Sequence, residues 1–115
     1  WTDNIWMGVS VESQRYTDRI DHLRRVPAKV RFLSCEPLLG ALDLDLTDIH
    51  WVIVGGESGH NHRPMQADWS RGIGHGCLAT NTAFFFKQWG GITTKAGGRV
   101  LDDSYWHQFP DAAKG

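Results

Sequence analysis

One stretch decides the fold that the sequence predicts, and it reads Trp51-Val52-Ile53-Val54-Gly55-Gly56-Glu57. Its four apolar residues are continuous and do not alternate with polar ones, which is typical of a strand buried on both faces in a parallel sheet. The glycine pair and the glutamate that follow mark the end of this strand. The stretch therefore predicts a buried strand that brings a flexible turn and a carboxylate to one edge of a sheet.

Other apolar runs along the chain end in the same way, in polar or glycine residues. They cover residues 5–11, 30–35 and 83–86. Each is rich in Val, Ile, Phe or Trp and has the length of a strand. Together with residues 51–54, they predict four strands buried on both faces.

The segments between these runs differ in their helical pattern. Residues 13–26 place Tyr16, Ile20 and Leu23 on one face of an amphipathic helix that ends before Pro27. Residues 37–49 contain a glycine and several aspartates, so we expect an irregular crossover there instead of a helix.

A second helix is expected over residues 67–80, with Trp69, Ile73 and Cys77 on its buried side. Gly72, Gly74 and Gly76 each cost such a helix about 1 kcal/mol relative to alanine. This helix must therefore be held by packing.

The alternation of strands and connections predicts an α/β fold with four parallel strands in the order of the chain. Residues 1–91 form this unit. Residues 92–115 form a loop-rich tail that docks on the same domain through Leu101, Trp106 and Phe109.

Composition and charge limit the classes of protein that fit. The chain has 115 residues, 41% of them hydrophobic, which suits one soluble globular domain. Twelve basic residues against thirteen acidic ones leave a formal charge of −1, which disfavours nucleic acid as a partner. No apolar run approaches the roughly 20 residues that span a bilayer, so we expect a cytoplasmic protein without a membrane partner.

The two cysteines exclude some sites. Cys35 and Cys77 are far apart in the sequence and show no Cys-x-x-Cys spacing. They exclude a disulfide framework and an all-cysteine metal site, and we expect two buried thiols.

The glutamates mark a candidate binding site. The chain has only Glu12, Glu36 and Glu57, and each follows a different predicted strand. In parallel α/β folds the carboxyl ends of the strands form the ligand-binding face. Strand ends also carry polar residues simply because they meet solvent, and this alternative applies to any one glutamate. The candidate binding residues are Ser10, Glu12, Glu36, Gly55, Gly56, Glu57, Ser58, Lys87 and Gln88.

The glycine turn after residue 54 has a chemistry of its own. Paired glycines let the backbone approach a ligand and present N–H groups to an anion, although a plain turn accounts for them too. The sequence matches neither a dinucleotide-binding fingerprint nor a phosphate-binding loop. Glu57, His60 and His62 offer ligands for a metal, but they lie in a loop without metal-site spacing, so no metal is predicted and the role of the histidines stays open.

Several motifs together resemble the phage gene-product 37/68 family of unknown function. They are Asn4-Ile5-Trp6-Met7-Gly8-Val9-Ser10-Val11-Glu12, Arg31-Phe32-Leu33-Ser34-Cys35-Glu36-Pro37-Leu38-Leu39-Gly40, Trp51 to Gly59, Arg63-Pro64-Met65 and Phe84-Phe85-Phe86-Lys87-Gln88-Trp89-Gly90. Members are similar to radical S-adenosylmethionine proteins, which bind an iron–sulfur cluster near the N-terminus of a barrel about twice this length. The resemblance implies that this chain is a half-barrel, similar to the C-terminal half of a TIM barrel, and that it lacks the cluster cysteines.

The resemblance leaves two classes of function open. As part of a radical S-adenosylmethionine enzyme, the candidate residues would hold substrate or the methionyl end of the cofactor, with S-adenosylmethionine and the cluster belonging to a full-length parent. As a non-catalytic module, the same residues would bind a small polar ligand or the chain would oligomerise. The implied partner is the missing N-terminal half of the barrel or a second copy of this chain.

Overall fold

The computed structural model describes residues 5–57, 63, 65–89, 100–101 and 104–110. The elements, in chain order, are β1 (Trp6–Ser10), the 3₁₀ turn η1 (Gln14–Tyr16), α1 (Asp18–Arg24), β2 (Val30–Cys35), β3 (Trp51–Gly55), α2 (Ala67–Thr80), β4 (Ala83–Gln88), β5 (Val100–Leu101) and β6 (Ser104–Tyr105). They confirm the four predicted strands and the second helix, with shifts of at most about two residues at their ends. The helix predicted over residues 13–26 is shorter than expected, because its first part forms the separate turn η1.

The four long strands form one parallel sheet in the order β1-β2-β3-β4. This confirms the predicted α/β class and the sequential strand order. The pairing is regular except at Val54 and Gly55, where the register of β3 against β4 shifts by one residue.

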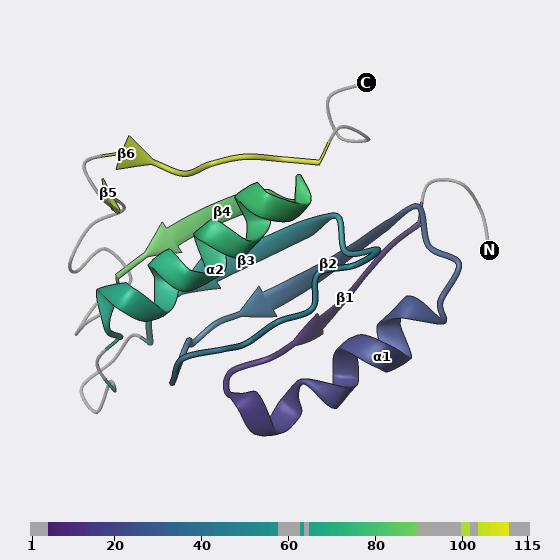
Figure 1. The fold of residues 1–115 in the computed structure, drawn as a ribbon, viewed down its shortest axis with the longest axis horizontal. Helices are drawn as coiled ribbons and strands as arrows, with labels where there is room; N and C mark the ends of the chain where they lie inside the picture. The colour runs from purple at the N-terminus through teal and green to yellow at the C-terminus, as the bar shows by residue number, and fades with distance from the viewer. Residues whose placement is uncertain (1–4, 58–62, 64, 90–99, 102–103, 111–115) are drawn as a thin grey trace.

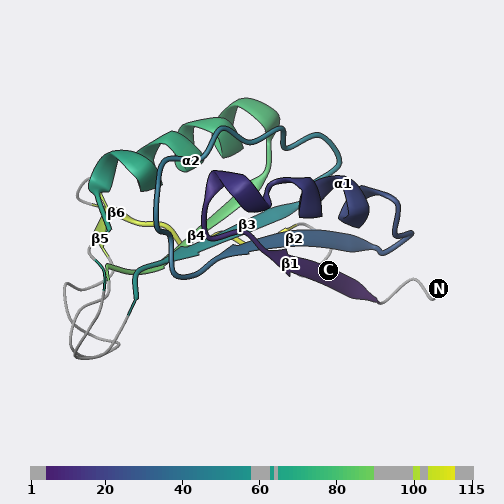
Figure 2. The same cartoon turned by 90° about the horizontal axis from the view of Figure 1, so that it is seen from below.

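All three crossovers lie on the same face of the sheet (Figures 1 and 2). In Figure 2 both helices and the segment that joins β2 to β3 lie above the strands. The core is packed between these layers, and its largest fully buried side chains include Leu23, Leu33, Leu38, Val54 and Phe86. We call this side of the sheet the helix face and the opposite side the open face.

The prediction that the strands are buried on both faces is wrong. On the open face Trp6, Phe32, Trp51 and Phe85 remain partly accessible, and Trp6 is 36% exposed. These rings cover one another: the Trp51 ring lies 5.7 Å from Phe32 and 6.3 Å from Phe85. The apolar runs are continuous because an aromatic cluster, and not a second layer of helices, shields this face in the described residues.

The two helices differ in how they are stabilised. Helix α1 buries Ile20 and Leu23. Helix α2 contains the predicted glycines and is capped by Asn81, which adopts the left-handed conformation (φ 56°) while its N–H bonds back to the last turn.

Within the described part of the chain, no helix has the length and apolar character that crossing a membrane requires.

The crossover between β2 and β3 is irregular, as expected. It buries Leu38, Leu46 and Ile49 in the core. Arg24 of α1 holds it from the side, because its Nε donates to the Thr47 carbonyl at 2.8 Å. A second branch of the guanidinium binds the Asp45 carbonyl. The crossover is thus held by its buried apolar residues and by Arg24, although it forms no helix.

The described part of the tail covers one edge of the sheet. The Phe86 N–H donates to the Trp106 carbonyl and the Gln108 N–H to the Phe84 carbonyl, so residues 106–108 run antiparallel to β4 (Figure 1). Leu101 is buried in the core. The outer edge of β4 is therefore covered by the chain's own tail.

Candidate functional site

The carboxyl ends of the strands are joined by backbone hydrogen bonds. The Leu38 N–H donates to the Gly55 carbonyl, the Leu39 N–H to the Glu12 carbonyl and the Gly56 N–H to the Gln88 carbonyl, each at 2.9 Å. These bonds fix the segments that follow β1, β2 and β3 against neighbouring strands. We call this edge, with the candidate residues on it, the carboxyl rim.

Glu36 and Lys87 form an ion pair on the rim. The Lys87 Nζ lies 3.1 Å from the Glu36 Oε2, although Glu36 directly follows β2 and Lys87 lies near the end of β4, with β3 between them. Gly55 leaves room for this contact, because it has no side chain. A Cβ built on Gly55 would stand 3.0 Å from the Glu36 Oε2 and 3.1 Å from its Cγ, so the carboxylate passes directly over this glycine.

The pair belongs to the open face. Val52 and Val54 point to the helix core, so the alternating position Gly55 faces the opposite side. The Glu36 carboxylate stands over Gly55 and Lys87 contacts that carboxylate, which places the Lys87 ammonium group on the open face as well. The aromatic cluster and the ion pair therefore share one side of the sheet.

Glu57 has a different partner. Its carboxylate accepts hydrogen bonds from the Arg63 backbone N–H at 2.8 Å, from Nε at 3.0 Å and from a terminal guanidinium nitrogen at 2.6 Å. The hydrogen bond and the negative charge of Glu57 raise the pKa of Arg63. Glu57 thus anchors the far end of the segment that begins after Gly56.

Glu12 is held by α1. The Arg19 guanidinium lies 3.6 Å from the Glu12 Oε2, and the same nitrogen donates to the Ser10 carbonyl at 2.7 Å. Arg19 also stacks over the Tyr16 ring, 4.3 Å from its centroid. Of the three glutamates, only Glu36 is paired with Lys87.

The remaining candidate residues have mixed positions. The Ser10 side chain is exposed and Gln88 is buried, with 6% of its surface accessible. Ser58, His60 and His62 lie outside the described residues, so the structure gives no geometry for a metal site around them.

The sequence reasoning missed the aromatic cluster as part of this site. Trp51 is its centre, with ring centroids of Trp6 at 6.0 Å and Phe109 at 5.4 Å. His107 stacks on Phe85 at 4.6 Å. The sequence shows one such aromatic in each predicted strand, at positions 6, 32, 51 and 85, but not the register that brings them together. An apolar surface thus extends below the rim.

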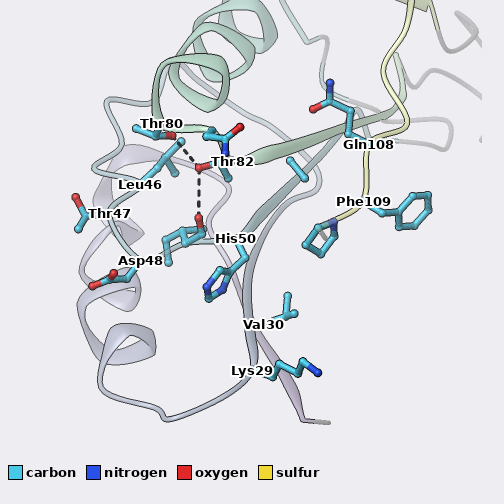
Figure 3. Close-up of a pocket in the computed structure, with 14 residues that line it drawn as sticks. Lys29, Val30, Leu46, Thr47, Asp48, His50, Thr80, Thr82, Gln108 and Phe109 are labelled. Atoms are coloured by element: carbon cyan, nitrogen blue, oxygen red, sulfur yellow. Dashed lines mark hydrogen bonds between the residues drawn. The ribbon is translucent and has the colours of Figure 1, made fainter. Parts of the chain in front are cut away.

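A pocket of about 810 Å³ lies at the opposite, amino ends of the strands (Figure 3). It is lined by residues 29–30, 46–50, 80–83 and 108–110. Two of its threonines already form hydrogen bonds within the protein. The Thr82 hydroxyl donates to the Ile49 carbonyl at 3.3 Å and lies 2.8 Å from the Thr80 hydroxyl. These bonds fix the loops before β3 and β4.

His50 is a titratable residue of this pocket that the sequence did not mark as a candidate. Its Nδ1 accepts the Arg31 backbone N–H at 2.9 Å, so the neutral ring carries its proton on Nε2. Burial lowers the pKa of His50, the positive charge of Arg31 lowers it further, and Asp48 partly offsets both effects. The neutral imidazole is the form that the structure selects.

The cysteines are buried free thiols, as predicted. Burial raises the pKa of Cys35 to about 12, and Cys77, Glu12 and Glu36 add to the shift. Burial alone raises the pKa of Cys77 to about 12. Both thiols are therefore protonated at neutral pH and unsuited to bind a metal or to act as nucleophiles.

Comparison with known proteins gives a family without a function. No curated protein and no solved structure matched the chain. The kinship with phage gene products and with radical S-adenosylmethionine proteins stays a prediction. A family model matches residues 1–110, nearly the whole chain, and carries the description "Protein of unknown function (DUF5131)". The chain therefore belongs to this uncharacterised DUF5131 family.

Proposed function

We propose that this chain is one half of a (β/α) barrel, whose open face lines the interior and whose carboxyl rim binds a small polar ligand. The strand order supports this architecture. When parallel strands are added in the order of the chain by right-handed crossovers, all crossovers lie on one face of the sheet, as in a barrel. In doubly wound sheets the strand order reverses, and helices cover both faces. Here the strand order is β1-β2-β3-β4 and both helices lie on one face, which is the arrangement of a barrel.

The ion pair of Glu36 and Lys87 carries the proposal for the ligand. Its side chains are 25% and 50% exposed, and an ion pair this accessible contributes only about 0–1 kcal/mol. A ligand that bears both an ammonium and a carboxylate group can replace each partner with little loss. The rim therefore suits the α-amino acid end of a ligand.

The aromatic cluster supports a ligand with an apolar or ring-bearing body. Phe85 lies on the same face and on the same strand as Lys87. A molecule held by its amino acid end at the rim would extend over these rings. S-adenosylmethionine has both parts, an amino acid end and a purine ring, and it is the ligand that we propose.

The iron–sulfur cluster that accompanies radical S-adenosylmethionine chemistry does not fit the cysteines of this chain. Such clusters need several thiolates, and Cys35 and Cys77 are two buried, protonated thiols. The proposal is therefore a binding function at the rim. It assigns no catalytic residue and no reaction step to the chain.

Calorimetric titration of the 115-residue chain tests the proposal. S-adenosylmethionine is the probe, and methylthioadenosine, which lacks the amino acid end, is the comparison ligand. We expect Glu36→Gln and Lys87→Met to weaken binding of S-adenosylmethionine by about tenfold or more, because each removes a charge-assisted contact. Binding of methylthioadenosine should change little.

Asp21→Asn is the matched control, because it removes a carboxylate that pairs with Arg24 on α1 and is not a candidate binding residue. The affinity of this variant for S-adenosylmethionine should equal that of the unmodified chain. The proposal fails if S-adenosylmethionine does not bind, or if Asp21→Asn weakens binding as much as Glu36→Gln does.

A further inference from the structure

Two serines lie side by side on the open face, on neighbouring strands. Ser34 of β2 lies between Leu33 and Cys35, which belong to the core of the helix face, so the Ser34 side chain is directed to the open face. Ser10 of β1 is its register partner, and the next residue, Val11, is buried in the same core. Register partners in a parallel sheet lie about 4.8 Å apart and direct their side chains to the same face. We call Ser10 and Ser34 the serine pair.

The serine pair lies in one row with two apolar residues. Ile53 of β3 pairs with Ser34, and Phe85 of β4 pairs with Ile53. Ile53 and Phe85 each lie between two core residues of their own strand, so their side chains also face the open side. Across the sheet, this row therefore presents two hydroxyls followed by two apolar side chains.

The hydroxyls of the serine pair have hydrogen-bonding capacity to spare. Within the described residues, neither serine side chain makes a hydrogen bond of its own. Only the backbone carbonyls are used, since the Ser10 carbonyl accepts from Arg19 and the Ser34 carbonyl accepts from the Val11 N–H. Each hydroxyl can donate one hydrogen bond and accept two. The pair can therefore bind a group that both donates and accepts.

The serine pair lies between the other two features of the open face. Toward the rim, Glu36 follows Ser34 by two residues and forms the ion pair with Lys87. Toward the amino ends of the strands, Phe32 precedes Ser34 by two residues and its ring lies against Trp51. Residues two apart on a strand are separated by about 6.6 Å. Charges, hydroxyls and rings therefore follow one another along the open face at steps of about this length.

We infer that the serine pair binds a vicinal diol, of the kind that a ribose ring carries, in the ligand that the rim holds. The inference rests on the proposed function, because it places the middle part of the same molecule. The two hydroxyls of a diol suit two serines on neighbouring strands, while Ile53 and Phe85 would lie against carbon atoms of the sugar. S-adenosylmethionine carries its amino acid end, its ribose and its purine ring in the order in which the rim, the serine pair and the aromatic cluster follow one another.

Calorimetric titration of the 115-residue chain with adenosine and with its dideoxy analogue tests the inference. The analogue keeps the purine ring but lacks both hydroxyls of the diol. We expect it to bind about tenfold or more weakly than adenosine, because it loses the hydrogen bonds to both serines. This comparison needs no variant of the protein.

Ser34→Ala shows whether the preference comes from the serine pair. This variant should bind adenosine about threefold to tenfold more weakly and bind the dideoxy analogue as before, whereas a general change of structure would weaken both. Ser10→Ala should act in the same way. Ser70→Ala is the matched control, because the Ser70 hydroxyl lies on α2 and bonds to the Met65 sulfur at 3.5 Å. Both affinities of this control should equal those of the unmodified chain.

Three outcomes overturn the inference. They are equal binding of the two nucleosides, binding of neither, and an equal loss of both affinities in Ser34→Ala. Failure of the proposed function is seen separately, through the effects of Glu36→Gln and Lys87→Met on S-adenosylmethionine. A retained preference for adenosine over its analogue in those two variants, with unchanged affinity for S-adenosylmethionine, would support the serine pair and contradict the rim.

Discussion

The Glu36 Oε2 and the Lys87 Nζ lie 3.1 Å apart, and the Glu36 carboxylate stands over Gly55. The ion pair therefore depends on the absence of a side chain at Gly55. The carboxylate crosses strand β3 at the one position where no Cβ stands in its way. The rim is therefore sensitive to a methyl group added at Gly55, because that group would stand against the Glu36 carboxylate.

Gly55→Ala should separate the pair. The new Cβ would stand 3.0 Å from the Glu36 Oε2 and must push the carboxylate aside. We expect the free energy of unfolding to change by no more than about 1 kcal/mol, since an accessible ion pair is weak. S-adenosylmethionine affinity, measured by calorimetry, should fall by about tenfold or more.

Gly40→Ala is the control for Gly55→Ala, because a Cβ at Gly40 meets nothing within 4 Å. Unchanged affinity in Gly55→Ala would show that the ion pair does not hold the ligand.

Two glycines of α2 should respond differently to alanine. Gly72→Ala should stabilise the protein by about 0.5–1 kcal/mol, because its Cβ meets nothing within 4 Å and alanine is the better helix former. Gly74→Ala should gain less or destabilise, because its Cβ would stand 3.2 Å from the Phe84 ring. Urea denaturation measures both, and equal gains would contradict this packing.

His50 should make stability depend on pH. Its pKa is lowered in the folded state, so the unfolded chain binds the extra proton more readily. The stability that the neutral His50 ring contributes is fully present above about pH 6.5, the ordinary pKa of histidine. It is lost as the pH falls through the lower pKa that His50 has in the folded protein. His50→Asn keeps an acceptor for the Arg31 N–H and should lose less stability between neutral and mildly acidic pH. Identical urea-denaturation profiles for both proteins would contradict the assignment.

Cys35 and Cys77 should resist alkylation in the folded protein. Burial raises the pKa of both thiols to about 12, which leaves little thiolate at pH 8. Mass spectrometry after treatment with iodoacetamide should find the native chain unmodified and the chain in denaturant modified at both sites. Rapid modification of the native chain at either cysteine would show that its site opens.

The sequence was sufficient to predict the strands, because long apolar runs separated by an amphipathic segment are typical of parallel strands and their crossovers. It also placed Glu36 and Lys87 on one edge, since parallel strands end on the same side. The pairing of Glu12 with Arg19 and of Glu57 with Arg63 was not predicted. Which of several nearby cations a carboxylate binds depends on side-chain positions that spacing does not encode.

The open face shows why the sequence overstated the burial of the strands. A continuous apolar run indicates that both faces are shielded, but it does not say by what. Trp51 is shielded by rings from its own sheet and by Phe109 from the tail, and its indole N–H donates to the Gln108 carbonyl. That contact joins residues far apart in the chain. No local pattern identifies it.

The sequential order of the strands also bears on the synthesis of this chain. Each strand pairs with the one made just before it, so β2, β3 and β4 can each dock as they emerge. The segment that protects β4 arrives last, about twenty residues after Gln88. At a rate of synthesis of about 5–20 residues per second, the outer edge of β4 stays unpaired for roughly one to four seconds. A nascent chain that stalls after β4 would expose an edge that the finished protein hides.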